Sequence, residues 1–278
     1  MICRSYNGPK RERTGLKNDI AYAHADFIPG GADYPDAWAD TSRAYREREA
    51  AVGRARLNHP YGSGERQKMD IFHPAGKAEG LVVYVHGGYW LKFDRGFWSH
   101  FSAGLTRRGM MVAIPSYTLA PDARVRDITR EVARAIEAAA ALAPGPIALT
   151  GHSAGGHLVA RMLCRDVVLA DDVRARLSKV VPISPVADLR PLLDTSMNAT
   201  LGLDRDEAEA ESPVLHRPVD VPVTVWIGAE ERPVFLDQAR WLAEAWGAEH
   251  RIAPGRHHFD VIDDLTDPDS PLVRALLG

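Results

Sequence analysis

The chain has 278 residues, of which 45% are hydrophobic and 26% are charged, and its formal net charge is -3. These values are typical of a globular protein and favour one large α/β unit over several small domains. Lys and Arg are spread along the chain, so no basic face for nucleic acid is expected. Cys3 and Cys164 form no Cys-x-x-Cys motif, which predicts neither a disulfide framework nor a zinc site.

No targeting or membrane segment is apparent in the sequence. The first residues are followed by polar and charged residues, not by the apolar stretch of a signal peptide. The longest uncharged stretch, 138–160, is interrupted by Pro144, Gly145 and Pro146. We therefore expect a soluble cytoplasmic protein that has no membrane partner.

Strands and helices are predicted to alternate along most of the chain. A polar arm over 1–33, mobile at its start, is expected to lead into a helix over 34–53. Strands are predicted at 68–73, 81–85, 110–114, 147–149, 179–183, 223–227 and 250–253, and helices at 97–108, 127–142, 154–165 and 234–246. This alternation indicates a mainly parallel sheet with helices on both faces and its ligand site at the carboxyl ends of the strands.

The segment 185–222 lacks strand patterning. We expect it to form an excursion over the body, a small cap, in which the acidic stretch 204–211 is a solvated helix.

The motif Gly151-His152-Ser153-Ala154-Gly155 lies between a predicted strand and a predicted helix. Gly-x-Ser-x-Gly in this context is a nucleophile elbow, a tight turn that exposes a serine hydroxyl. Glycines are needed there because the strand and helix backbones nearly touch. Ser153 is therefore the candidate nucleophile.

A serine nucleophile needs a base and an acid, which on this fold follow in the order serine, acid, histidine. His257 and His258 come after the last strand, and we prefer His258 as the base because only imidazole titrates near neutrality. Glu230 and Glu231 come after the preceding strand. Glu231 is preferred because it stands three residues past the strand-ending Gly228, and Glu230 stays open as the alternative.

Backbone N–H groups are expected to stabilise the oxyanion. Gly87 and Gly88 follow a buried strand, and Ala154 follows the nucleophile, so these three residues are the candidate oxyanion hole.

Aromatic side chains near the same edge are candidates for a substrate pocket: Tyr89, Trp90 and Tyr117, with Phe93 and Trp98 beside them. Arg190 or Arg232 could meet a substrate carboxylate.

No metal or cofactor is expected. The sequence has 11 histidines but no His-Glu-x-x-His motif and no phosphate-binding glycine loop. Histidines outside the candidate site are interpreted as scattered surface or core residues, namely His24, His59, His73, His100, His157, His216 and His250.

Several of these motifs resemble the α/β-hydrolase superfamily. The segments 86–90 and 151–158, and Ser184-Pro185 followed by 188–192, are similar to the arylformamidase (kynurenine formamidase) branch, beside the hormone-sensitive lipase-like esterases. The segment 117–121 is similar to one in those esterases, and the resemblance runs from about residue 69 to 262. The family usually has aspartate where Glu231 stands here.

The resemblance implies an α/β-hydrolase domain at 58–278, with the arm and helix of 1–57 packed on it. It also implies hydrolysis of an N-formyl arylamine such as N-formyl-L-kynurenine through a formyl-enzyme on Ser153. A general short-chain carboxylesterase is the alternative, and a non-catalytic binding protein or a metal-dependent formamidase are the alternatives of another kind. The expected partner is a small-molecule substrate, and homodimer formation stays open.

Overall fold

The computed structural model describes residues 16–278 and contains an eight-stranded sheet with the order β1-β2-β4-β3-β5-β6-β7-β8. The strands are β1 (Ala55–Pro60), β2 (Lys68–Phe72), β3 (Gly80–Val85), β4 (Met110–Pro115), β5 (Ile147–His152), β6 (Leu177–Ile183), β7 (Thr224–Gly228) and β8 (Glu249–Ala253). The β1–β2 and β2–β4 pairs are antiparallel, and the other pairs are parallel. The predicted mainly parallel sheet is confirmed.

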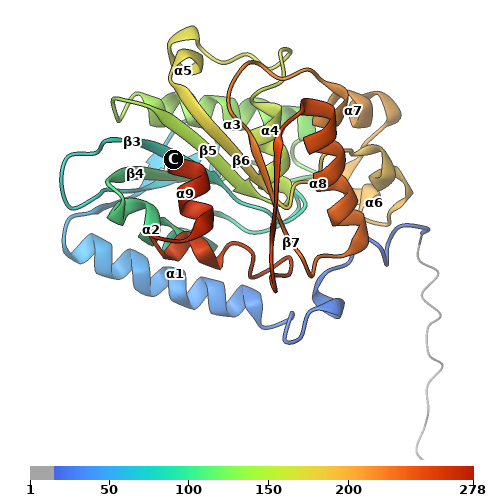
Figure 1. Ribbon diagram of the computed structural model, residues 1–278, viewed down its shortest axis with the longest axis horizontal. Helices are drawn as coiled ribbons and strands as arrows, with labels where there is room; N and C mark the ends of the chain where they lie inside the picture. Colours follow the sequence, from blue (N-terminus) through green and yellow to red (C-terminus); the bar gives the residue numbers. More distant parts are fainter. Residues whose placement is uncertain (1–15) are drawn as a thin grey trace, which may run out of the picture.

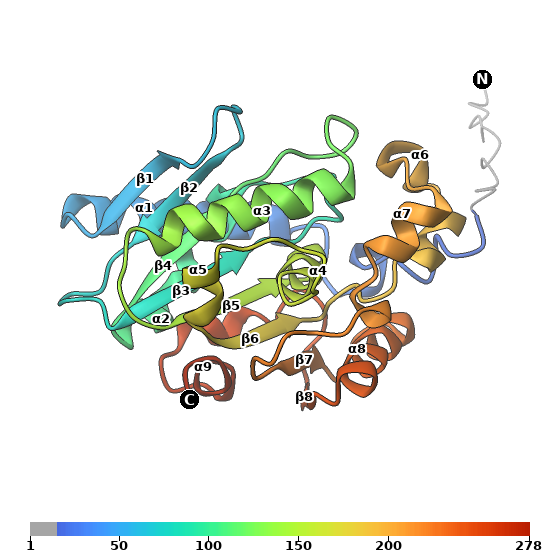
Figure 2. The same cartoon turned by 90° about the horizontal axis from the view of Figure 1, so that it is seen from above.

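Helices cover both faces of the sheet (Figure 1). One face packs against α1 (Tyr34–Ala51), α2 (Ser102–Arg107) and α9 (Pro271–Leu277), and the other against α3 (Val125–Ala140), α4 (Ala154–Arg161) and α8 (Pro233–Trp246). The shorter helices α5 (Asp171–Ala175), α6 (Asn198–Leu201) and α7 (Arg205–Ala210) lie in the connections. In Figure 2, seen from above, α3 and α4 lie in front of the sheet.

The central strands are buried on both faces, which explains their continuous apolar runs. In β3, Val83 and Val85 pack in the core on the α3 side, whereas Val82 and Tyr84 pack in the core on the α2 side. Alternate side chains of a strand point to opposite faces, so both faces of β3 must be apolar.

Two regions differ from the sequence prediction. β1 is not predicted, because it carries the turn-like residue Asn58 at φ 58° inside an irregular pairing with β2. The region 97–108 is not one helix: two 3-10 turns, Arg95–Phe97 and Ser99–Phe101, precede the short α2.

The predicted boundary between residues 57 and 58 falls inside β1. Because β1 pairs with β2, the chain leaves α1 and enters the sheet directly. Ahead of α1, residues 16–33 lie against the body: Asn18 N–H donates to the Asp194 carbonyl at 3.1 Å, and Gln238 Nε2 donates to the Tyr22 hydroxyl at 2.9 Å. The mobile start expected before this arm lies outside the described residues, as does Cys3.

The expectation of a solvated acidic helix at 204–211 is wrong for two of its carboxylates. Glu207 and Glu211 are buried. Glu207 accepts from Arg124 Nε at 2.6 Å, and Glu211 accepts from Arg161 Nε at 3.1 Å. Two acidic residues of this segment therefore form ion pairs with the body: Glu207 with the partly exposed Arg124 just before α3, and Glu211 with the buried Arg161 of α4.

Within residues 16–278, no helix combines the length and the apolar character needed to cross a membrane.

Arg161 is a stability test for the packing of α4, because its side chain is buried between Glu211 and Asp166. Removing one partner of a buried ion pair leaves an uncompensated charge, so Arg161→Met is expected to lower the free energy of unfolding by about 3–5 kcal/mol. The matched control is Arg205→Met, whose pair with Glu209 is exposed and is expected to contribute less than about 1 kcal/mol. Urea unfolding of both variants measures the difference, and equal losses would contradict it.

Candidate active site

The candidate residues come together at the carboxyl edge of the parallel strands. The loops that follow β3, β5, β7 and β8 carry Gly87 and Gly88, Ser153, Glu231 and His258. β6, between β5 and β7, adds Ser184 directly after its end. Sequence-distant residues therefore share one site because neighbouring parallel strands end at the same edge.

Ser153 forms the sharp turn between β5 and α4. Its backbone has φ 57° and ψ -115°, a left-handed conformation that is rare for a residue with a side chain. A methyl group at Gly155 would collide with the Val85 carbonyl, and one at Gly151 would collide with the Gly155 carbonyl. Glycines at these two positions therefore permit the close approach of helix and strands that the turn requires.

His258 and Glu231 contact each other directly. The Nδ1 atom of His258 lies 2.8 Å from Glu231 Oε2, and the Ser184 hydroxyl donates to Glu231 Oε1 at 2.5 Å. Both side chains of the pair are buried, whereas Glu230 is exposed. The geometry therefore makes Glu231 the partner of His258, and Ser184 holds its second oxygen.

His257 faces away from this pair. Its Nε2 lies 3.3 Å from the Tyr34 hydroxyl, and its Nδ1 lies 3.1 Å from Asp260. The loop is instead fastened through His152, whose Nε2–H donates to the His258 carbonyl at 2.8 Å. Burial lowers the pKa of His152 well below its usual range, so this ring is neutral.

The loop 86–89 has a fixed backbone conformation. The His86 Nδ1–H donates to the Gly87 carbonyl at 2.8 Å, which fixes the peptide plane that carries the Gly88 N–H. Burial lowers the pKa of His86 to about 4 and keeps the ring neutral. Gly88 has φ 109°, where a side chain is strained, and Ala154 is the first residue of α4, where N–H groups lack helical acceptors.

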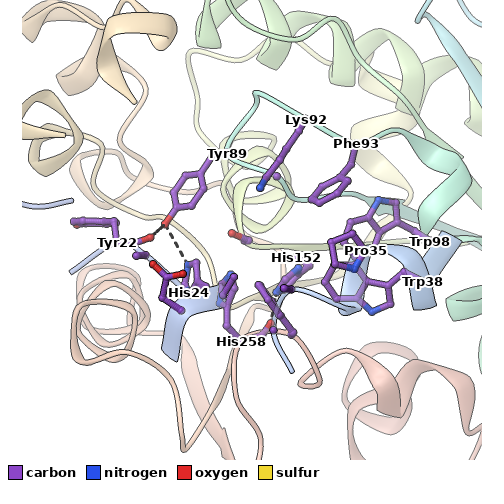
Figure 3. Close-up of a pocket in the computed structure, with 18 residues that line it drawn as sticks. Tyr22, His24, Pro35, Trp38, Tyr89, Lys92, Phe93, Trp98, His152 and His258 are labelled. Atoms are coloured by element: carbon purple, nitrogen blue, oxygen red, sulfur yellow. Dashed lines mark hydrogen bonds between the residues drawn. The ribbon is translucent and has the colours of Figure 1, made fainter. Parts of the chain in front are cut away.

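A cavity of about 320 Å³ opens onto Ser153 and His258 (Figure 3). Part of its wall is aromatic, with Trp38 from α1, Tyr89, Phe93 and Trp98 from the segment after β3, and Phe259; small residues of the arm, such as Ala23, Ala25 and Ala32, form another part. Its volume is at the lower end of small-molecule sites, which fits a substrate of one or two rings.

Two of the predicted pocket residues do not line this cavity. Trp90 is fully buried and packs edge-on against His157, with ring centroids 5.0 Å apart. Tyr117 is also fully buried, stacks on His86 at 4.3 Å and donates its hydroxyl to the His86 carbonyl at 2.9 Å. Tyr117 therefore supports the glycine loop from behind, where sequence position alone suggested a wall.

The arginines considered for a substrate carboxylate are engaged elsewhere. Arg190 Nη2 pairs with Asp188 at 2.6 Å. Arg232 lies over the Phe27 ring at 3.6 Å and donates to the Ile20 carbonyl. Lys92, which the sequence reading did not single out, is instead the basic side chain that lines the cavity in the described chain.

His24 is the second residue that sequence reasoning missed. The sequence alone gives it no role beyond that of a scattered histidine, yet its ring stacks on His258 with centroids 3.6 Å apart. No local motif surrounds it, because the arm that carries it meets the last loop only in the folded chain.

His24, Glu231 and His258 offer ligand atoms within 4.8 Å of one another, a spacing that could hold a metal ion. The two rings are nearly parallel, however, with 6° between their planes. Nitrogen lone pairs lie in the ring plane, so those of stacked rings do not converge on one ion. Glu231 already accepts from Ser184 and contacts His258, which leaves the set poorly suited to a metal.

The parallel sheet, the strained Gly-x-Ser-x-Gly turn and the following acid and histidine loops define a hydrolase of the α/β class. The sequence profile of the alpha/beta hydrolase fold family matches residues 82–251. The chain is 30% identical over 238 residues to the kynurenine formamidase of Drosophila melanogaster, covering 78% of each chain. It is 27% identical over 277 residues to that of Danio rerio, covering 94% of this chain and 89% of the relative.

Among solved structures, a candidate thioesterase from Silicibacter sp. TM1040 superposes with a TM-score of 0.92 at 52% identity, covering 95% of this chain and all of that one. Esterase B from Lactobacillus rhamnosis superposes with a TM-score of 0.65 at 18% identity, covering 88% of this chain and 92% of that one, and shares the fold. The chain belongs to the α/β-hydrolase family, in its arylformamidase branch.

Proposed function

We propose that this protein is a serine hydrolase that cleaves small aryl formamides, with N-formyl-L-kynurenine as the first candidate substrate. The observation that carries the proposal is the aromatic cavity that ends at Ser153 and His258. An aryl ring fits between its aromatic side chains, next to Ser153 and His258. The similarity to kynurenine formamidases supports the same substrate class.

The proposed reaction has two steps. The Ser153 oxygen attacks the formyl carbon while His258 accepts the hydroxyl proton, and the Glu231 carboxylate stabilises the resulting imidazolium. The N–H groups of Gly87, Gly88 and Ala154 stabilise the oxyanion. The C–N bond then breaks, and His258 returns the proton to the leaving arylamine.

The second step releases the acyl group. Water, deprotonated by His258, attacks the formyl ester on Ser153, and the ester bond breaks to give formate and the free serine. The same groups could cleave a thioester or a short-chain ester, because attack by the serine, oxyanion stabilisation and proton transfer to the leaving group are common to all three substrate classes. The likeness to the Silicibacter protein favours thioesters as the second candidate. The cytoplasmic location stays a prediction.

The first test is the ratio of kcat/KM for N-formyl-L-kynurenine to that for p-nitrophenyl acetate and for phenyl thioacetate. We expect the formamide to be preferred, and Ser153→Ala to lose about 10³-fold or more on every substrate. Turnover of the ester or thioester alone would reject the formamide assignment and keep the serine mechanism. Full activity of Ser153→Ala would reject the serine mechanism.

Glu231 and Glu230 provide a matched pair of neighbouring carboxylates. Glu231→Gln is expected to lower kcat by about 10²- to 10⁴-fold, because a neutral amide holds the wrong imidazole tautomer and does not stabilise the imidazolium. The exposed Glu230→Gln is the control and should retain kcat within about twofold, as surface changes do. Steady-state kinetics with p-nitrophenyl acetate measures both, and an inactive Glu230→Gln would reverse the assignment.

Lys92 tests whether the substrate carries a carboxylate. Its ammonium group lies 5.3 Å from the Phe93 ring centroid at the cavity wall. Lys92→Met is expected to raise KM for N-formyl-L-kynurenine about tenfold, the equivalent of one lost charge-assisted contact of about 1.4 kcal/mol. The measurement is the ratio of kcat/KM for N-formyl-L-kynurenine to kcat/KM for 2-formamidoacetophenone, which lacks the amino-acid group. Arg190→Met is the control cation, and an unchanged preference in Lys92→Met would remove Lys92 from substrate recognition.

A further inference from the structure

The contact between His24 and His258 joins the N-terminal arm to the proposed base. The two imidazole rings are stacked, with centroids 3.6 Å apart and planes 6° apart (Figure 3). His24 is buried and lines the same cavity as Ser153. The His24 ring covers one flat face of the His258 ring. In the proposed mechanism, a nitrogen of His258 must point toward Ser153.

Tyr89 and Phe235 contact the His24 ring and hold it in place. Its Nε2 lies 3.2 Å from the Tyr89 hydroxyl, and that hydroxyl donates to the Tyr22 carbonyl at 2.7 Å. The hydroxyl has one proton, so it accepts from His24, and His24 carries its proton on Nε2. Phe235 of α8 packs edge-on against the same ring, with the two ring centroids 4.4 Å apart.

His24 is neutral in this position. Burial is the main cause that lowers its pKa well below the usual range, and the nearby His258, His152, Arg232 and Lys92 lower it further. The other titratable groups that face it are the Tyr89 hydroxyl and Glu231. A neutral ring matters because the proposed mechanism charges His258, and a second charge 3.6 Å away would oppose that step.

We propose that His24 is a positioning residue for His258: its flat ring fixes the plane of the base and keeps water from one face. This inference rests on the proposed serine mechanism but not on the choice of substrate. It makes residues 22–24 of the arm part of the active site.

The test compares two variants that fill the same space. His24→Phe keeps a flat ring over His258, whereas His24→Leu keeps an apolar side chain without a flat face. The measurement is the second-order rate of Ser153 labelling by a fluorophosphonate between pH 5 and 9, which reports activation of the serine directly. Melting temperatures are recorded alongside, and Ile20→Ala, an exposed change on the same arm, is the control.

We expect His24→Phe to label within about threefold of the parent protein, with the same pH profile. His24→Leu should label about 10- to 100-fold more slowly, the loss typical of a displaced catalytic group.

Equal rates and pH profiles for the Leu and Phe variants would overturn the proposal, even if both melt at lower temperature. This holds also where both variants label Ser153 equally slowly, because a flat ring at position 24 would then not be what positions His258. Failure of the parent protein to label would instead reject the serine mechanism itself, so the two failures are distinguishable.

Discussion

The change from strand to helix within one residue, at Ser153, is the constraint on which the rest of the site depends. The serine is held at φ 57°, a conformation that costs an ordinary residue roughly 1–2 kcal/mol. The cost is met by close packing of α4 against β3 and β6, which Gly155 and Gly156 permit because any side chain there would strike strand or loop backbone. The strain is thus imposed by the sheet, and it presents the hydroxyl at the sheet edge.

Around this turn, buried side chains hold the candidate catalytic groups in position. Ser184 holds Glu231, His152 holds the His258 loop through its carbonyl, and Tyr117 and His86 hold the glycine loop. These supporting groups are buried and neutral, so they fix geometry without adding charge to the cavity. Such preorganisation is what electrostatic stabilisation of an oxyanion requires.

The arm closes the cavity, whereas the excursion packs on the body away from the cavity lining. Residues 16–33 close one side of the cavity and bring His24 to His258, while the excursion 185–222 is anchored by Glu211 to Arg161 on the elbow helix. Both segments lack strong periodicity, and their conformations come from contacts with the body. The cavity is lined by the arm, by α1 and by the segments after β3, β5 and β8, and its lining includes no residue of 185–222.

The sequence by itself determined the α/β class, the order of most strands and helices, and the positions of Ser153, His258 and the glycine loop at strand ends. Those features are local: apolar periodicity, glycine spacing and residue order report directly on a strand, a turn or a helix. Only the tertiary structure decided which glutamate meets His258, that Trp90 and Tyr117 are core, and that His24 and Lys92 face the cavity. The physical reason is that burial and contact between distant segments depend on how the helices and the arm pack on the sheet, which no short stretch of sequence encodes.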